Sequence, residues 1–262
     1  MQGIPITKVN FLNIMWGILK CYICIMQNAG MEYLNSRLMF GMAPGLKSTR
    51  LLCEALGNPQ EKFKSIHVVG TNGKGSTSYY LAGILKGFGF RTALYTSPHL
   101  VNLRERIRID DEPIAEADLN RYLLQVTVAA EQVNQRNVEK IEPTFFEVLT
   151  LVAFLHYANS GVEVAVLEAG MGGRLDSTAV ADGSVAIVTS VGLEHTEILG
   201  ATESAILREK MAVVGEDASR AAGKVFVLGG LPQPLLEEAL EYASRLGARA
   251  FVPEIRDDIP LP

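Results

Sequence analysis

A glycine-rich segment, GTNGKGST, has the residue types of a phosphate-binding loop. Gly70 begins the segment after an apolar run, Lys74 adds a positive charge, and the glycines allow the backbone to approach an anion closely. Fewer residues separate the first glycine from the Gly-Lys pair than in the common P-loop, and another glycine stands between Lys74 and Ser76. A tight turn without a ligand is the alternative. The candidate phosphate-binding residues are Thr71, Asn72, Gly73, Lys74, Gly75 and Ser76.

Glu168 is a second candidate for chemistry, because it directly follows the apolar run VEVAVL and precedes a glycine-rich turn. A carboxylate that emerges from a buried strand is rare unless it is paired or binds a metal ion. A metal site, a helix-capping role and an ion pair with Arg174 are the explanations that the residues leave open.

Ser97 and His195 also follow apolar runs, in the segments TSPHL and GLEHTEILG. A serine before a proline is also a plain way to end a strand, and a lone histidine is often structural. A histidine that shares a sheet edge with Glu168 and a phosphate loop is typical of a metal ligand, although Mg²⁺ prefers oxygen ligands. Lys210, in REKMAVV, has by itself the pattern of a solvated lysine.

Short β-branched runs alternate with glycine-containing turns and amphipathic segments along most of the chain. This alternation predicts an α/β fold with a doubly wound, mostly parallel sheet and flanking helices. Ligands bind such sheets at the carboxyl ends of the strands, where the candidate residues lie. Strands are expected at 66–69, 91–96, 162–167, 185–190, 224–228 and 248–252, and helices at 74–88, 115–138, 143–159, 202–214 and 232–246.

Two of these helices carry more specific expectations. The first helix places Tyr80, Leu81, Ile84, Leu85 and Phe88 on one face. The helix at 143–159 is expected to hold its proline in the first turn, where the missing N–H costs nothing.

The composition of the 262 residues, 48% hydrophobic and 20% charged, is that of a globular protein. The net charge is −5 and the basic residues form no run, which argues against a nucleic-acid partner. Cys21 and Cys24 form a lone C-x-x-C without the second ligand pair of a zinc site. The cysteine usage therefore predicts a reduced, cytoplasmic protein.

Residues 1–30 differ from the rest, since they contain no arginine, serine or acidic residue. The apolar run 11–26 is short for a membrane span and is interrupted by Lys20. We expect an extension outside the fold, either poorly ordered or translated upstream of a start at Met31, with a weak anchor or signal as the alternative. A membrane partner is not expected.

Together these motifs resemble the Mur ligase superfamily, and within it the folylpolyglutamate synthase/dihydrofolate synthase branch, over residues 31–256. The resemblance rests on HVVGTNGKGS, YTSPHLVNLRERIRID, PTFFEVLT, VLEAGMGGRLDST, GLEHTEILG and REK, in the family's order. It implies an ATP-binding central domain with a P-loop-like site, ATP as co-substrate and Mg²⁺ as cofactor.

The resemblance also implies roles for single residues. Lys74, His195 and Lys210 are implied as catalytic, with Lys210 carrying a carbamate whose oxygen binds a metal ion. The implied Mg²⁺ ligands are Ser97, Glu168, His195 and Lys210, and Ser76 is not among them. The implied substrate-binding residues are Thr144, Phe145, Phe146, Glu147, Leu175, Asp176 and Ser177, with a further segment near Pro44 and Gly45.

The implied reaction joins L-glutamate to a pteroate or folate carboxylate through an acyl phosphate. Its small-molecule partners would be dihydropteroate or tetrahydrofolate, L-glutamate and ATP, and a monomer is expected. Two alternatives remain: a ligase acting on a cell-wall precursor, and a non-catalytic fragment that binds nucleotide or pteroate.

The chain departs from the family pattern in three places. Ala179 stands where the family has asparagine, and Met211-Ala212-Val213 replaces Ala-Gly-Ile after Lys210. The resemblance places the start of a linker at 257–262 and leaves a second, C-terminal domain outside the sequence. The expected organisation is therefore an extension at 1–30, the ATP-binding domain at 31–256 and the linker.

Overall fold

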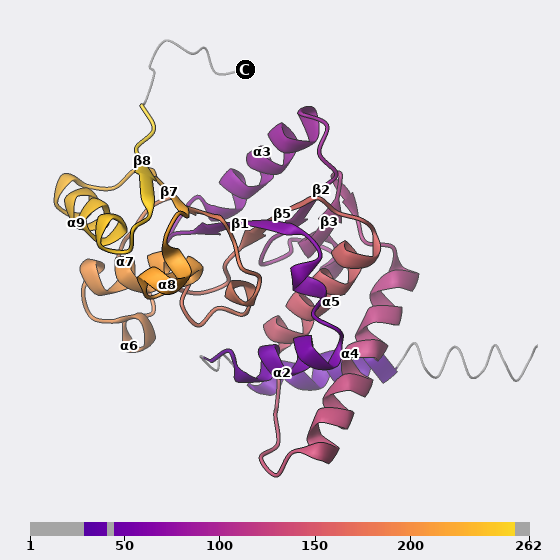
Figure 1. Cartoon of the computed structure of the whole chain (residues 1–262). Coiled ribbons are helices and arrows are strands. Elements are labelled where there is room, and N and C mark those ends of the chain that lie inside the picture. Colours follow the sequence, from indigo (N-terminus) through magenta and orange to yellow (C-terminus); the bar gives the residue numbers. More distant parts are fainter. Residues whose placement is uncertain (1–28, 41–44, 255–262) are drawn as a thin grey trace, which may run out of the picture.

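The computed structural model describes residues 29–40 and 45–254. Within these residues the chain forms one sheet of eight strands (Figure 1). Its strands are β1 (Lys64–Val69), β2 (Thr92–Tyr95), β3 (Ile107–Ile109), β4 (Glu112–Pro113), β5 (Val164–Glu168), β6 (Val185–Val188), β7 (Val225–Leu228) and β8 (Arg249–Phe251). They lie in the order β4-β3-β2-β5-β1-β6-β7-β8. All neighbours pair in parallel except those of β3 and β4, which form an antiparallel hairpin beside β2.

The helices flank this sheet. They are α2 (Lys47–Ala55), α3 (Lys74–Gly87), α4 (Glu116–Arg136), α5 (Phe145–Asn159), α6 (Thr196–Leu199), α7 (Glu203–Met211), α8 (Ala218–Ala221) and α9 (Gln233–Arg245). Residues 29–36 are also helical, and short 3-10 helices lie at Arg37–Phe40, Pro59–Glu61, Leu103–Arg106, Ser177–Val180 and Ala212–Val214. The predicted fold class is confirmed. The β3–β4 hairpin, α2, α6 and α8 were not predicted, since each is short or lacks a clear apolar period.

The strand order brings the candidate residues to one edge. The chain leaves β1 for β2 on one side, returns to β5, and then crosses β1 to β6 on the other side. Val68 is level with Glu168 across β1 and β5, and Val69 is level with Val188 across β1 and β6. Because these strands are parallel, the turns that follow β1, β2, β5 and β6 all open on the same side.

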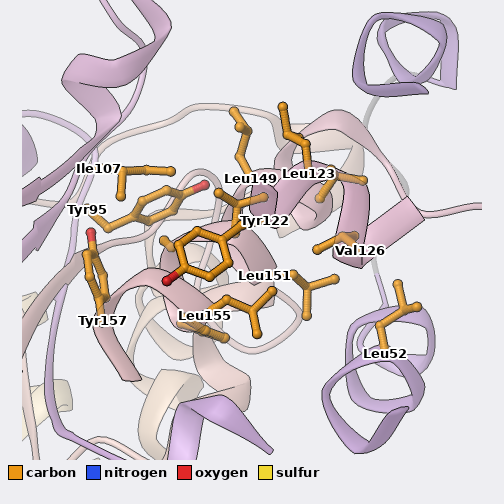
Figure 2. Packing of buried hydrophobic residues seen from close by; sticks show 14 of the residues in the cluster. Leu52, Tyr95, Ile107, Tyr122, Leu123, Val126, Leu149, Leu151, Leu155 and Tyr157 are labelled. Atoms are coloured by element: carbon orange, nitrogen blue, oxygen red, sulfur yellow. The ribbon is translucent and has the colours of Figure 1, made fainter. Parts of the chain in front are cut away.

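The main core lies between one face of the sheet and a layer formed by α2, α4 and α5 (Figure 1). Helix α5 is apolar on all sides and almost entirely buried, as expected for a helix enclosed by a sheet and two other helices. Tyr157 anchors it to the sheet, because its buried hydroxyl donates a 2.8 Å hydrogen bond to the Leu94 carbonyl. Figure 2 shows Tyr95, Tyr122 and Tyr157 packed among the aliphatic side chains of this layer.

The start of α5 differs from the prediction. The helix begins at Phe145, and the predicted first-turn proline, Pro143, lies before the capping residue. Thr144 accepts a hydrogen bond from the Glu147 backbone N–H, while Glu147 accepts one from the Thr144 N–H. This capping box satisfies two N–H groups and sets the helix boundary.

Helix α3 packs on the opposite face of the sheet, against Val68, Leu94 and Val166. The apolar face predicted for it is only partly buried: Leu81 and Leu85 pack on the sheet, whereas Tyr80, Ile84 and Phe88 are exposed. The helix is turned so that its small residue Ala82 joins the contact with the strands, which leaves Tyr80, Ile84 and Phe88 of the predicted face outside this contact.

The expectations for residues 1–28 and for the linker at 257–262 lie outside the described residues, as do Cys21, Cys24 and Pro44. Residues 29 and 30, predicted to belong to the extension, are already helical, and Gly30 is in close contact with Leu123 of α4. Within the described residues, no helix combines the length and the apolar character needed to cross a bilayer.

His67 lies in the middle of β1 and is fully buried. Its Nε2 is 2.9 Å from the Ala181 carbonyl oxygen, and Gly183 leaves no room beyond its ring. Burial lowers the pKa of His67 to about 4, so the folded protein holds the neutral imidazole at neutral pH.

We therefore predict that His67 makes the fold sensitive to acid. The unfolded chain takes up a proton near the usual histidine pKa of 6.5, whereas the folded chain does so only near 4. Stability is thus lost as the pH falls from 6.5 towards 4, by up to about 3 kcal/mol. His67→Gln, which can keep the bond to Ala181, is expected to flatten the dependence of the free energy of unfolding on pH. An unchanged pH profile would contradict the assignment.

Candidate functional site

The glycine-rich segment forms the turn between β1 and α3, as predicted. Gly73 adopts φ +82° and caps the helix, which then begins at Lys74. Gly70 adopts φ +151°, and a Cβ there would lie 1.9 Å from the Thr189 hydroxyl oxygen, so that only glycine fits. The free N–H groups of the first turn of α3 point out of this loop and suit an anion.

Lys74 lies over the loop that precedes it. Its ammonium donates hydrogen bonds to the carbonyls of Gly70 at 2.8 Å and Thr71 at 3.2 Å. The positive charge is therefore held at the loop itself, where a bound phosphate group would benefit from it.

Glu168 ends β5 and is 3% exposed. One carboxylate oxygen accepts a 2.9 Å hydrogen bond from the Ser97 backbone N–H, at the end of β2. A Cβ on Gly75 would lie 3.6 Å from the other oxygen, so the carboxylate faces the start of α3. The structure thus brings Ser97, Glu168 and the phosphate loop together at one point of the sheet edge.

The pKa of Glu168 is raised by burial, although the bond from Ser97 and the charge of Lys74 oppose the shift. The predicted alternative of an ion pair between Glu168 and Arg174 is wrong. Arg174 pairs with Glu209 at 2.7 Å and Glu216 at 3.3 Å instead.

Oxygen donors that suit Mg²⁺ are present at this point. The Glu168 carboxylate and the Ser97 residue are adjacent, and a carboxylate beside an anion-binding loop calls for a cation between the two negative charges. The residues present therefore fit a magnesium ion. Among the described residues, no three His, Cys, Asp or Glu side chains are grouped as a metal site would need, so hydroxyl, phosphate or water oxygens would complete the coordination.

His195 lies on the turn after β6, at the same edge of the sheet. It adopts φ +45° and precedes α6, with its side chain exposed. Among the described residues, no hydrogen bond joins its imidazole to Glu168 or Ser97, and its role as a metal ligand stays a prediction.

Lys210 is 1% exposed, and the expectation of a solvated lysine, drawn from the residues alone, is wrong. Its ammonium donates a 2.5 Å hydrogen bond to Glu194, a residue that the sequence analysis did not single out. Burial lowers the pKa of Lys210, although the bond and charge of Glu194 oppose the shift. The turn after β5 lies against the same helix end, since a Cβ on Gly173 would be 2.5 Å from the Lys210 carbonyl oxygen.

A cavity of about 560 Å³ opens at the same sheet edge, where Ser97 and Glu209 are among its lining residues. Its wall combines the turn after β2, the start of α5, the turn after β5 and α6. Of the seven predicted substrate residues, six line it: Thr144, Phe146, Glu147, Leu175, Asp176 and Ser177. Phe145 does not; its ring lies under the Arg106 guanidinium, 5.5 Å from the ring centre. Gly45 lines the cavity as well.

Two of the predicted substrate carboxylates are engaged by the fold itself. Asp176 is buried and accepts hydrogen bonds from the N–H groups of Gly170, Met171 and Thr178 and from the Thr178 hydroxyl. Glu147 accepts from the Thr49 hydroxyl in addition to closing the capping box. Both carboxylates shape the cavity wall. Asp176 accepts four hydrogen bonds and has little capacity left for a ligand, whereas Glu147 accepts two and keeps some.

Arg106 is a cavity residue that the sequence analysis quoted within a motif but did not assign. Its Nε donates to His99 Nδ1 at 2.9 Å, and burial lowers its pKa although the guanidinium remains charged. A half-buried cation in a largely apolar cavity suits an anionic group of a ligand. No spacing signal in the sequence singles it out from the neighbouring arginines.

The departures from the family pattern are accommodated by packing. Ala179 is 3% exposed and lies in the apolar cluster beneath β6 and β7, away from the cavity lining. Met211 and Val213 are buried in the same cluster, next to the end of α7 that carries Lys210.

The family model for the Mur ligase middle domain matches residues 68–228, more than half of the chain. The chain belongs to the Mur ligase family. The matched region contains the phosphate loop, Glu168, His195 and Lys210 together with the end of β1 and the whole of the parallel strands β2, β5, β6 and β7.

The chain is similar to a curated protein and to solved structures whose names refer to folate metabolism. The chain is 36% identical over 186 residues to the dihydrofolate synthase/folylpolyglutamate synthase of Bacillus subtilis (strain 168), covering 71% of this chain and 43% of the relative. A solved structure of Mycobacterium tuberculosis folylpolyglutamate synthase complexed with ADP and AMPPCP has a TM-score of 0.76 and 32% identity. The match covers 86% of this chain and 50% of the chain in that structure.

A further solved structure is that of E. coli FolC in complex with DHPP and ADP, with a TM-score of 0.74 and 31% identity. The match covers 86% of this chain and 51% of the chain in that structure. The chain thus spans about half of each solved structure and less than half of the Bacillus relative.

Asp176 offers a test of the cavity wall. In Asp176→Asn an amide N–H₂ would face backbone N–H groups, so buried donors lose their acceptor, and we expect the free energy of unfolding to fall by about 2 kcal/mol. Asp118→Asn, which removes only an exposed ion pair with Arg121, is the matched control and should change little. Equal stability of the two variants in urea unfolding would refute the assigned role.

Proposed function

We propose that this chain forms the ATP- and pterin-binding part of a ligase that joins L-glutamate to a pteroate or folate carboxylate. The observation that carries the proposal is the meeting of three features at one sheet edge: the phosphate loop, the buried Glu168 carboxylate and the cavity lined by Thr144 and Asp176. The names of the relatives support the same substrates. Dihydropteroate or tetrahydrofolate, L-glutamate and ATP are the proposed small-molecule partners.

The proposed ligation proceeds in two steps, phosphorylation of the carboxylate and formation of the amide bond. A substrate carboxylate oxygen attacks the γ-phosphorus of ATP, and the bond to the β,γ-bridging oxygen breaks, giving an acyl phosphate and ADP. The amine of L-glutamate then attacks the acyl carbon, phosphate leaves and the nitrogen loses a proton. Such transfers depend mainly on positioning and electrostatics, without a protein nucleophile.

The residues of this chain have distinct tasks in those steps. The backbone N–H groups from Gly73 to Ser76 bind the phosphates, and Lys74 neutralises charge on the transferred group. Thr71 and Asn72, whose N–H groups are bonded to Ser190, shape the loop around them. The cavity positions the substrate carboxylate towards the loop and excludes water from the acyl phosphate. Ser97 and Glu168 would hold Mg²⁺, with His195 as a further ligand, and the ion would supply charge neutralisation at the phosphate oxygens.

Lys210 is proposed as the family's carbamate-bearing lysine. Its amine nitrogen would attack CO₂ and lose a proton, which converts a cation into an oxygen ligand for a second ion. The lowered pKa of Lys210 supports this, because the neutral amine is the reacting form.

We place the protein in the cytoplasm and propose that it acts as a monomer. The described cysteine, Cys53, is buried and unpaired, which agrees with a reducing compartment.

A nucleotide-binding measurement tests the site directly. Lys74→Ala should weaken binding of a Mg²⁺-loaded ATP analogue at least about tenfold, because a charge-assisted contact to phosphate is lost. Lys86→Ala, which removes an exposed lysine from the same helix, is the control and should bind as the parent does. Equal affinities for the two variants would place the nucleotide elsewhere.

Phosphate release with dihydropteroate, ATP, Mg²⁺ and L-glutamate then separates a complete ligase from a binding domain. Release that depends on both dihydropteroate and L-glutamate supports the ligase. Nucleotide binding without any release above background would mean that this chain binds its ligands without turning them over.

Glu168→Gln should have opposite effects on stability and on metal-dependent binding. Burial raises the pKa of Glu168, so ionisation is disfavoured in the ligand-free fold, and the variant should be more stable at neutral pH. Its advantage should grow as the pH rises from the usual glutamate pKa of 4.5 through the raised value, and should vanish below 4.5. Mg²⁺-dependent nucleotide binding should be lost. Unchanged binding would remove Glu168 from the metal site.

A further inference from the structure

The segment after β6 is bonded to the phosphate loop along its length. The Thr71 backbone N–H donates to the Ser190 carbonyl at 2.9 Å, and the Asn72 N–H donates to the Ser190 hydroxyl at 2.9 Å. The Thr189 and Ser190 hydroxyls donate to the Asn72 carbonyl at 2.7 and 3.0 Å. The backbone N–H and carbonyl of Asn72 are therefore both hydrogen-bonded to side chains of the turn that follows β6.

The same segment holds the side chain of Thr71. The Thr71 hydroxyl accepts a 3.0 Å hydrogen bond from the Gly192 N–H and lies 3.2 Å from the Gly192 carbonyl oxygen. Burial raises the pKa of Glu194, but the hydrogen bond and charge of Lys210 outweigh burial, and the pKa lies below the usual value.

The segment ends on Lys210. Glu194 accepts the 2.5 Å hydrogen bond from the Lys210 ammonium. Within the described part of the chain, this is the only hydrogen bond of the Lys210 side chain. Lys210 is 1% exposed and Glu194 is 23% exposed, so the lysine depends on this carboxylate for its counter-charge. No described hydrogen bond joins Lys210 directly to residues 70–76.

We propose that Glu194 is a positioning residue that couples Lys210 to the phosphate loop through the segment from Thr189 to Glu194. Its carboxylate fixes the Lys210 ammonium, and Gly192, two residues earlier on the same segment, fixes the Thr71 hydroxyl. A displacement of the Lys210 side chain is therefore transmitted to the loop that binds the nucleotide phosphates. The link to nucleotide binding rests on the proposed function, whereas the link between Lys210 and the loop concerns the ligand-free fold alone.

Amide hydrogen exchange of the ligand-free protein tests the coupling. In Glu194→Gln the Lys210 ammonium loses its counter-charge, and exchange at Thr71 and Asn72 should be about tenfold faster. Lys210→Met, which changes a residue with no bond to the loop, should speed exchange at the same two amides. Glu203→Gln removes an exposed carboxylate at the other end of α7 and is the matched control.

The double variant decides between coupling and general loosening. If Glu194 transmits the effect, Glu194→Gln/Lys210→Met exchanges no faster at Thr71 and Asn72 than the faster single variant. The proposal would be overturned if the increase in exchange rate in the double variant equalled the product of the increases in the two single variants. It would also be overturned if the Thr71 and Asn72 amides stayed protected in either single variant. Should Glu194→Gln not fold, Glu194→Asp, which keeps the charge on a shorter side chain, should also speed loop exchange.

Affinity for Mg²⁺-AMPPCP supplies the functional readout. Glu194→Gln and Thr71→Val should each weaken binding about tenfold, and the double variant should be no weaker than the weaker single one. If the parent protein does not bind Mg²⁺-AMPPCP, the proposed ATP site fails while the exchange experiment still decides the coupling. If the parent binds but Glu194→Gln binds equally well, the coupling fails and the ATP site stands.

Discussion

The carboxylate of Glu168 is the charge around which the functional edge is arranged. It is buried at the end of β5, receives one N–H from the end of β2, and faces the first turn of α3. A buried negative charge is costly unless donors or cations surround it. The cations of Lys74 and Arg106 lie close enough to stabilise it, one on the phosphate loop and one in the cavity. The two halves of the site thus share one electrostatic centre.

The polar residues of this edge fall into two groups. Asp176 and Glu147 are occupied by hydrogen bonds from their own loop and helix, and they hold the cavity wall rigid. Glu168 and the backbone of the phosphate loop retain acceptors and donors that point outward. A site can bind a charged ligand without reorganising when rigid, hydrogen-bonded residues hold in place the groups whose donors and acceptors remain free.

Lys210 connects this edge to the second apolar cluster. The side chains that follow it, Met211 and Val213, pack beneath β6 and β7, while its ammonium emerges beside Glu194. Packing on one side and a single ion pair on the other leave the lysine little freedom. Its position is therefore set by the core of the domain rather than by the ligands.

Much of the fold followed from local patterns. Apolar runs and glycine turns predicted the parallel strands and most helices, because burial on both faces leaves a strong periodic signal. The expected strand ends also put Ser97, Glu168 and His195 at one edge, since parallel strands share the side on which their turns open. The antiparallel β3–β4 hairpin escaped prediction, as its strands are too short to carry a pattern.

By itself, the sequence determined the fold class, the phosphate loop and the family, since these depend on residue types within short segments. Tertiary structure alone decided which groups meet. It paired Lys210 with Glu194 and Arg174 with Glu209, turned Tyr80 and Phe88 of α3 outward, and filled the acceptors of Asp176. Such pairings join residues far apart in the chain, and their geometry depends on how helices pack on the sheet, which no local pattern encodes.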